Sequence, residues 1–127
     1  MTDQKRILLV EDDRFLRKAA EVRLRRAGYT VITAADGEEA IATARTMRPD
    51  LVLLDLIMPR MQGFEVLRVL RTEPNMNGVP IVVLTNLSQD ADRERAMTQG
   101  ANGYLIKANL SLDALADAVG DALKGAA

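Results

Sequence analysis

The sequence predicts an α/β domain with a five-stranded parallel sheet and helices on both of its faces. Five short apolar runs alternate with five segments in which apolar residues recur at helical spacing. Each strand with its following helix takes about 20 to 30 residues, enough chain for a right-handed βαβ crossover. Glycine, proline and asparagine mark the turns between these segments. Together these observations indicate a doubly wound fold.

The central strand is predicted at Leu51–Asp55. Its continuous apolar run is typical of a short strand that is buried on both faces of a sheet. The run ends on the carboxylate of Asp55, and Met58-Pro59 cannot continue a regular strand. Open α/β sheets bind their ligands at the carboxyl ends of the strands. Asp55 is therefore the first candidate for chemistry.

Four similar runs predict further strands at Lys5–Val10, Thr30–Ala34, Ile81–Thr85 and Gly103–Lys107. The second run is short and flanked by polar residues, as expected of an outer strand. The other three lead into polar groups, namely Glu11-Asp12-Asp13, Thr85 and Lys107. Because the strands are predicted to be parallel, all of these groups meet Asp55 at one edge of the sheet.

Capping residues and apolar periodicity predict the first two helices. Asp13 caps a helix that stops at Gly28 and turns inward Leu16, Ala19, Ala20, Leu24 and Ala27. Its outer face is interpreted as solvated rather than nucleic-acid binding, and it contains Arg17, Lys18, Arg23, Arg25 and Arg26. Asp36 and Glu39 form a capping box for a second helix, which Pro49 closes.

Three more helices follow. The third comes after Gly63, with Val66, Leu67 and Leu70 inward. The fourth is predicted from a Ser88 cap to Gly100, and its thin apolar stripe marks it as an element that moves or meets a partner. Ser111 caps the last helix, whose inward residues are Leu112, Leu115, Ala116, Val119 and Leu123. A frayed tail is expected over 124–127.

Length and composition fit one domain over residues 1–127, with a core over about residues 5–123. The chain has 48% hydrophobic and 28% charged residues and no cysteine or histidine. Disulfides, thiolate or imidazole metal sites and phosphohistidine on this chain are thereby excluded. Seventeen Lys and Arg balance eighteen Asp and Glu, so bulk charge favours neither nucleic acid nor membrane. The polar N-terminus lacks a signal-peptide core, and we expect a cytoplasmic protein.

Glu11, Asp12 and Asp55 form an oxygen-rich cluster that repels itself without a cation. Such a cluster suits Mg²⁺ or Mn²⁺. With Lys107 to neutralise charge and Thr85 to donate a hydrogen bond, Asp55 has the parts needed to attack phosphorus. Taken singly, each residue has a plainer explanation as a helix cap, a strand residue or a strand-end charge. Asp55 resists that explanation, because an unpaired acid is costly to bury.

At these residues the chain closely resembles the receiver domain of bacterial two-component response regulators, in its stand-alone chemotaxis form. The resemblance covers residues 6 to about 123. Its motifs are Val10–Asp13, Asp55–Pro59 with Gly63, Leu84-Thr85 and Gly103–Lys107. It implies a flavodoxin-like sheet with the strand order 2-1-3-4-5.

The resemblance also implies roles. Asp55 would be the phosphoacceptor for a histidine kinase or phosphotransfer protein. Asp12, Asp55 and the backbone carbonyl of Ile57 would bind Mg²⁺ directly, and Glu11 through water. Thr85 and Tyr104 would form the switch. The face made by the fourth helix, fifth strand and fifth helix would then meet a downstream protein. Such a domain is not an enzyme beyond its own phosphorylation and dephosphorylation, and we expect a monomer, with phosphorylation-dependent dimerisation as the alternative.

Two positions depart from the family pattern, and two others bear on the lifetime of the phosphoryl group. Ala108 replaces the usual proline after the lysine, which predicts a trans peptide bond and a changed loop. Asn86 replaces a small residue after Thr85, where it could narrow access or impede Tyr104. Ile57 and Leu87 are apolar and cannot orient an attacking water, which predicts slow loss of the phosphoryl group.

The same residues bear on three other functions. A phosphohydrolase of the haloacid dehalogenase kind needs a second Asp where Ile57 stands. A flavodoxin-type flavin binder needs a neutral phosphate loop, whereas Glu11-Asp12-Asp13 would repel a phosphate. A receiver-like scaffold without phosphorylation remains the alternative to the switch, and Asn86 and Ala108 keep it open. No output module is expected after the last helix, so phosphorylation would act through the affinity for another protein.

Overall fold

The computed structural model of the protein describes residues 4–125. It contains five parallel strands in the order β2-β1-β3-β4-β5, as predicted. The strands are β1 (Arg6–Val10), β2 (Thr30–Ala34), β3 (Leu51–Leu54), β4 (Ile81–Thr85) and β5 (Gly103–Ile106). The helices are α1 (Arg14–Arg26), α2 (Gly37–Thr46), α3 (Gly63–Thr72), α4 (Asp90–Thr98) and α5 (Leu112–Gly125), with short 3-10 turns η1 (Pro74–Met76) and η2 (Lys107–Asn109).

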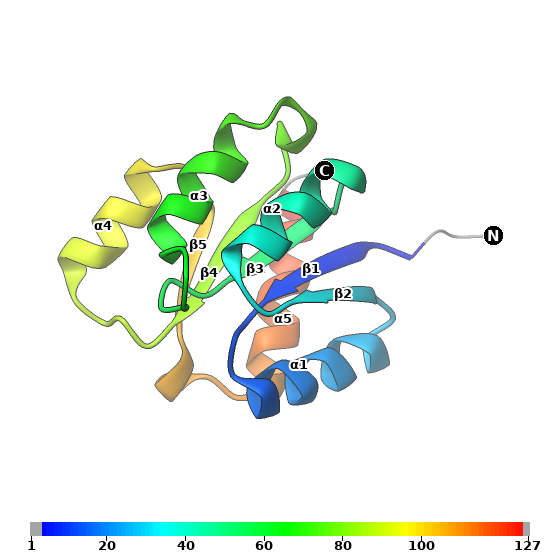
Figure 1. The fold of residues 1–127 in the computed structure, drawn as a ribbon. Helices are drawn as coiled ribbons and strands as arrows, with labels where there is room; N and C mark the ends of the chain where they lie inside the picture. The colour runs from blue at the N-terminus through cyan, green and yellow to red at the C-terminus, as the bar shows by residue number, and fades with distance from the viewer. Residues whose placement is uncertain (1–3, 126–127) are drawn as a thin grey trace.

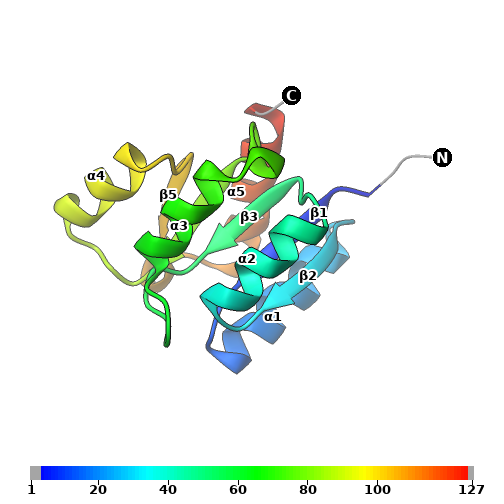
Figure 2. The same ribbon diagram turned by 45° about the horizontal axis from the view of Figure 1, so that its top comes forward.

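Helices cover both faces of the sheet (Figure 1). The helices α1 and α5 lie together on one face, while α2 and α3 lie side by side on the other, with α4 farther out beside β5 (Figures 1 and 2). Alternate strand residues enter two separate cores, because side chains of a strand point to opposite faces. In β3, for example, Val52 and Leu54 join the core under α2 and α3, while Leu51 and Leu53 face α1 and α5.

Several predicted caps are confirmed. The carboxylate of Asp13 accepts hydrogen bonds from the N–H groups of Phe15 and Leu16, and Ser111 Oγ accepts one from Ala114. Asp36 accepts from the N–H of Glu39 as in a capping box. The return bond of the box differs, because Glu39 accepts from the N–H of Ala35 instead of Asp36, at 3.4 Å.

Other details of the helices were predicted wrongly. The fourth helix begins at Asp90 after Gln89 without a side-chain cap, so Ser88 does not cap it. Ala27 is an exposed C-cap residue and Leu112 is 36% exposed, so neither belongs to an inward stripe. Both lie at a helix end, since Ala27 follows the last residue of α1 and Leu112 is the first residue of α5. The helix α5 continues to Gly125, and the last two residues of the predicted tail lie outside the described residues.

The thin stripe of α4 is confirmed, since Ala96 is the buried residue of this helix and Met97 is 41% exposed. A cation–π contact of Arg95 with the ring of Phe64, at 4.0 Å from the centroid, adds to its attachment. Within residues 4–125, no helix combines the length and the apolar character needed to cross a bilayer.

Replacing Gly63 with alanine should destabilise the fold by about 3 kcal/mol. A Cβ atom at Gly63 would lie 2.2 Å from the Cα of Leu56 and 2.5 Å from the carbonyl oxygen of Asp55, and neither backbone atom can move cheaply. Urea unfolding measures the change. Gly120→Ala is the matched control, because its Cβ meets only the hydroxyl of Tyr29 at 3.6 Å and alanine is the better helix former by about 1 kcal/mol. Equal effects of the two substitutions would refute the steric explanation.

Candidate functional site

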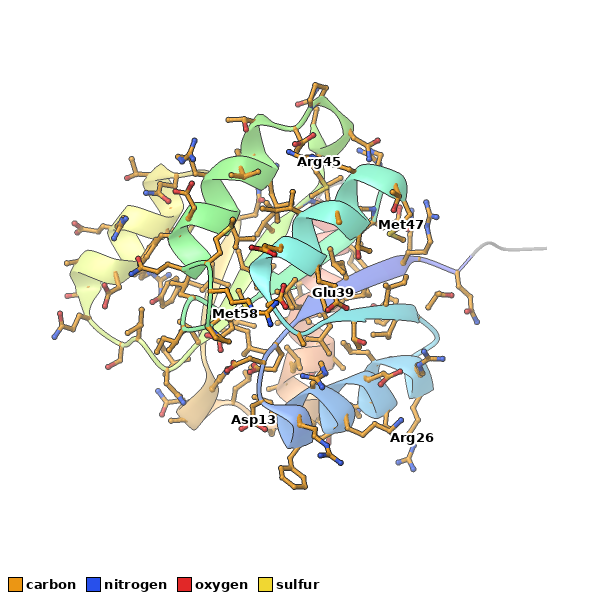
Figure 3. All side chains as sticks on the ribbon, in the orientation of Figure 1. Asp13, Arg26, Glu39, Arg45, Met47 and Met58 are labelled. Atoms are coloured by element: carbon orange, nitrogen blue, oxygen red, sulfur yellow. The ribbon has the colours of Figure 1, made fainter. Side chains whose placement is uncertain are left out.

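The candidate site lies at the carboxyl edge of the sheet, where β1, β3 and β5 each lead into one of its charged residues. The N–H of Glu11 donates to the carbonyl of Ala34, and the N–H of Asp55 donates to the carbonyl of Val10. Both bonds continue the parallel ladders one residue past the strands. Figure 3 labels Asp13, at the start of α1, and Met58, in the loop after β3, at this end of the sheet, with Met47 at the opposite end.

Three acids predicted to form a cluster do so. Each of Glu11, Asp12 and Asp55 offers a carboxylate oxygen, and these oxygens lie within 4.8 Å of one another. Glu11 and Asp55 are buried, at 1% and 3% exposure, whereas Asp12 is exposed. Burying two carboxylates side by side is unfavourable unless a cation joins them.

Lys107 supplies that cation. Its ammonium donates a hydrogen bond to Asp55 Oδ2 at 2.8 Å and lies 2.6 Å from Glu11 Oε1. The second contact is a close ion pair, so the same ammonium faces a carboxylate oxygen of each buried acid. Lys107 follows β5, one of the two edge strands of the sheet. Its long side chain reaches past the end of β4 to the acids that follow β3 and β1.

The pKa values of the pair follow from burial and contact. Burial raises the pKa of Glu11 above its ordinary value, and the contact with Lys107 only partly opposes this shift. Burial alone would lower the pKa of Lys107, but its contacts with Asp55 and Glu11 outweigh burial and raise it. Lys107 therefore stays protonated at neutral pH, and its positively charged ammonium remains paired with the carboxylates of Glu11 and Asp55.

Backbone groups hold the carboxylates in place. The N–H of Ile57 donates to Asp55 Oδ1 at 3.1 Å, and the N–H of Asp13 donates to Glu11 Oε2 at 3.0 Å. The Ile57 side chain is 53% exposed, so this residue takes part through its backbone. These bonds leave the carboxylates few alternative orientations.

Thr85 is the last residue of β4, and Tyr104 lies within the neighbouring strand β5. Thr85 is fully buried, and its hydroxyl oxygen accepts from the N–H of Leu87 at 3.4 Å. Tyr104 is 7% exposed, and its hydroxyl donates to the carbonyl of Leu87 at 2.7 Å. Burial, with a further contribution from Asp92, raises the pKa of this hydroxyl. The tyrosine is thus oriented toward the loop between β4 and α4.

Arg17 was missed as a member of the site. The sequence suggested a solvated outer face of α1, but Arg17 is partly buried, and its guanidinium donates to the backbone carbonyls of Glu11 at 2.8 Å and Asp12 at 3.2 Å. It thereby holds the turn that presents both acids. Its position one turn after the Asp13 cap was the only signal in the sequence, and on its own that position predicts nothing.

The peptide bond after Lys107 is trans, as predicted, since residues 4–125 contain no cis peptide bond. The following loop forms the 3-10 turn η2. Its residue Ala108 donates its N–H to Oδ1 of Asn86 at 3.1 Å. The two positions at which the sequence departs from the family pattern are therefore in contact.

A five-stranded 2-1-3-4-5 sheet with a lysine-bound aspartate and two further acids at its carboxyl edge defines the receiver class of signalling domains. The chain belongs to the response regulator receiver domain family, whose model matches residues 7–120.

Individual relatives agree with this assignment. The chain is 42% identical over 105 residues to a probable transcriptional regulator, ycf27, of Cyanophora paradoxa, covering 83% of this chain and 43% of the relative. It is 40% identical over 103 residues to the alkaline phosphatase synthesis transcriptional regulatory protein PhoP of Bacillus subtilis, covering 81% and 42%. The chain thus spans less than half the length of these curated relatives, and the stand-alone form stays a prediction.

Solved structures are similar over nearly their whole length. The chemotaxis protein CheY4 of Vibrio cholerae has a TM-score of 0.89 at 32% identity, covering 94% of this chain and 99% of that one. The receiver domain of the sensor histidine kinase PA1611 from Pseudomonas aeruginosa has a TM-score of 0.87 at 33% identity, covering 96% and 99%. That structure is described with a magnesium ion coordinated in its active site cleft.

The free energy of unfolding of the wild type should contain a contribution from Glu11 that falls as pH rises, and Glu11→Gln should abolish that contribution. Because the folded-state pKa of Glu11 is raised above 4.5, the folded protein keeps this proton to a higher pH than the unfolded chain does. Relative to Glu11→Gln, the free energy of unfolding of the wild type falls as pH rises from 4.5 through the folded-state pKa. Urea unfolding with a chelator, at pH values from about 4 to 7, measures the difference. A difference that does not change with pH would contradict the raised pKa.

Proposed function

We propose that the chain is the phosphoacceptor switch of a two-component phosphorelay and that Asp55 receives the phosphoryl group. The observation that supports this most directly is the contact of the buried Asp55 carboxylate with Lys107 at 2.8 Å, beside the acids Glu11 and Asp12. A carboxylate oxygen of Asp55 forms the new bond to phosphorus while the bond from phosphorus to the donor nitrogen or oxygen breaks. The product is an aspartyl phosphate.

Lys107 and Thr85 are proposed to stabilise the transferred group. The Lys107 ammonium, already on Asp55 Oδ2, can neutralise charge on a phosphoryl oxygen, and the buried Thr85 hydroxyl can donate a hydrogen bond to another. Tyr104 would respond through its hydrogen bond to Leu87, because a shift of the loop after Thr85 changes the acceptor of its hydroxyl. Thr85 and Tyr104 would thus form the switch.

The acids also fit a divalent cation. Three carboxylates lie within 4.8 Å of one another, and a donor set of oxygens with no nitrogen or sulfur ligand suits Mg²⁺ or Mn²⁺. Asp12, Asp55 and the backbone carbonyl of Ile57 would hold the ion, and Glu11 would act through water. When bound, the ion would supply positive charge for the phosphoryl oxygens.

Two kinds of partner are proposed, one from the phosphoryl-transfer chemistry at Asp55 and one from the weak attachment of α4. A histidine kinase or phosphotransfer protein would donate the phosphoryl group. The surface of α4, β5 and α5 would meet a downstream protein, since α4 has one buried residue and Met97 is 41% exposed.

We infer a single receiver unit over residues 1–127, with its core at about residues 5–123. It would work in the cytoplasm as a monomer without direct contact to nucleic acid or membrane, with a phosphorylation-dependent dimer as the alternative.

Incubation with acetyl phosphate and Mg²⁺ should add one phosphoryl group to the protein. Asp55→Asn should take up none, because an amide oxygen is a poor nucleophile and lacks the negative charge that Lys107 binds. Intact-mass spectrometry with and without Mg²⁺ measures the adduct. An adduct of equal amount on the Asp55→Asn protein would assign the acceptor to another residue. No adduct on either protein with Mg²⁺ or Mn²⁺ would favour the unphosphorylated scaffold.

The aspartyl phosphate should be lost slowly, with a half-life well above seconds at neutral pH. Ile57 and Leu87 are apolar residues of the two loops beside Asp55, and neither side chain can orient an attacking water. The decay of the intact-mass adduct after removal of acetyl phosphate measures the half-life. Ile57→Asn, which offers an amide to a water, is expected to shorten it several-fold. A wild-type half-life of seconds would show that these side chains do not limit hydrolysis.

A further inference from the structure

Two hydrogen bonds tie the loop between β4 and α4 to the segment that contains β5 and η2. The N–H of Ala108 donates to Oδ1 of Asn86 at 3.1 Å, and the hydroxyl of Tyr104 donates to the carbonyl of Leu87 at 2.7 Å. Two consecutive loop residues are thus each held by a donor from the same neighbouring segment. The Tyr104 bond starts from inside the core, whereas the Asn86 bond lies at the exposed rim of the site.

The bond of Asn86 extends the pairing of β4 and β5 beyond the last residues of the strands. The registered ladder ends with Thr85 opposite Ile106, and Ala108 lies two residues farther on. At the ends of β1 and β3 the corresponding step is made by backbone carbonyls, which hold the N–H groups of Glu11 and Asp55. Beyond β5 a side-chain amide takes the place of the carbonyl. The bond needs an N–H at position 108, which alanine has and proline would lack.

The tether acts on the residue next to it. Lys107 begins η2, and its ammonium must stay 2.8 Å from Asp55 Oδ2 and 2.6 Å from Glu11 Oε1. A lysine loses much rotamer freedom when it is held in one place, so free backbone motion at its base would add to the entropic cost. Fixing the backbone at Ala108 reduces that motion.

We propose that Asn86 is a positioning residue, which acts through the N–H of Ala108 to hold Lys107 on the carboxylates of Asp55 and Glu11. Asn86 does not need to touch the phosphoryl group for this effect. The consequence for phosphorylation rests on the function proposed above, but the positioning of Lys107 does not. If Asn86 instead only obstructed the site, its removal would have the opposite effect on the rate of phosphoryl uptake.

The structural part is tested without phosphorylation. Lys107 reactivity toward acetic anhydride, followed by mass spectrometry, reports how firmly the amine is held. Asn86→Ala and Ala108→Pro each remove one partner of the bond and should speed the labelling of Lys107 about five-fold, the effect expected for one hydrogen bond. The double variant should label no faster than either single variant, because both remove the same bond. Ala108→Ser keeps the N–H and is the matched control.

Amide proton exchange of Ala108, measured by NMR, provides a second structural readout. Exchange should be about five-fold faster in Asn86→Ala and should return to the wild-type rate in Asn86→Asp, which keeps an acceptor oxygen at the same place. Wild-type labelling of Lys107 in Asn86→Ala, or fully additive effects in the double variant, would overturn the proposal.

The rate of phosphoryl uptake from acetyl phosphate completes the test. In Asn86→Ala the maximal rate should fall about five-fold while the half-saturating concentration of acetyl phosphate stays unchanged, because charge neutralisation and not access is impaired. Faster uptake would show that Asn86 obstructs the site and would overturn the proposal. If the wild type takes up no phosphoryl group, the proposed function fails, while the labelling of Lys107 still decides whether Asn86 positions it.

Discussion

The contact of one lysine with two buried acids is the interaction on which the site depends. Glu11 and Asp55 lose their hydration at the edge of the sheet and repel each other, and Lys107 offsets part of both costs. Removing one partner of a buried ion pair usually lowers the free energy of unfolding by about 3 to 5 kcal/mol, because the other charge is left buried and unpaired. The acids follow β1 and β3 and the lysine follows β5, so the pairing needs the whole central sheet in its parallel order.

Close backbone contacts surround this ion pair and limit its freedom. The N–H of Gly63 donates to the carbonyl of Leu56 at 3.0 Å, which pulls the start of α3 against the residue after Asp55. Only glycine allows that approach. Arg17 from the other side of the sheet holds the turn of Glu11 and Asp12 through their carbonyls. The carboxylates are therefore aligned by the fold before any partner arrives, which is what electrostatic catalysis requires.

The helix α4 is attached to the sheet far less firmly than the acid cluster is held. The helix α4 has few apolar contacts, and the loop before it is held by side-chain hydrogen bonds from Ala108 and Tyr104. A domain that signals through changed affinity needs such an element, because a ligand shifts an equilibrium by no more than its differential affinity for the two states, and a weakly held element keeps that free-energy difference small. A firmly held acid cluster thus lies in the same domain as a helix with a single buried residue, which is the arrangement that the proposed switch requires.

The sequence by itself determined the sheet, its connections and most of the site. Short apolar runs that alternate with segments of helical apolar spacing leave few topologies open. In a parallel sheet of this kind, the polar residues that follow the strands meet at one edge. Glu11, Asp12, Asp55, Thr85 and Lys107 were predicted in this way, and the structure brings the three acids and the lysine into one cluster, with Thr85 at the end of β4. The trans bond before Ala108 also follows the prediction.

Only the tertiary structure decided how side chains at the ends of elements are used. Ser88 has the chemistry of a cap, yet the helix begins at Asp90 after Gln89, and the loop before it is held by Tyr104 and Ala108 from outside its own segment. Arg17 resembled its solvated neighbours until the turn beside it offered two carbonyls. The bond between Asn86 and Ala108 joins residues 22 positions apart. Local propensity contains no information about such partners, since they exist only after distant strands have paired.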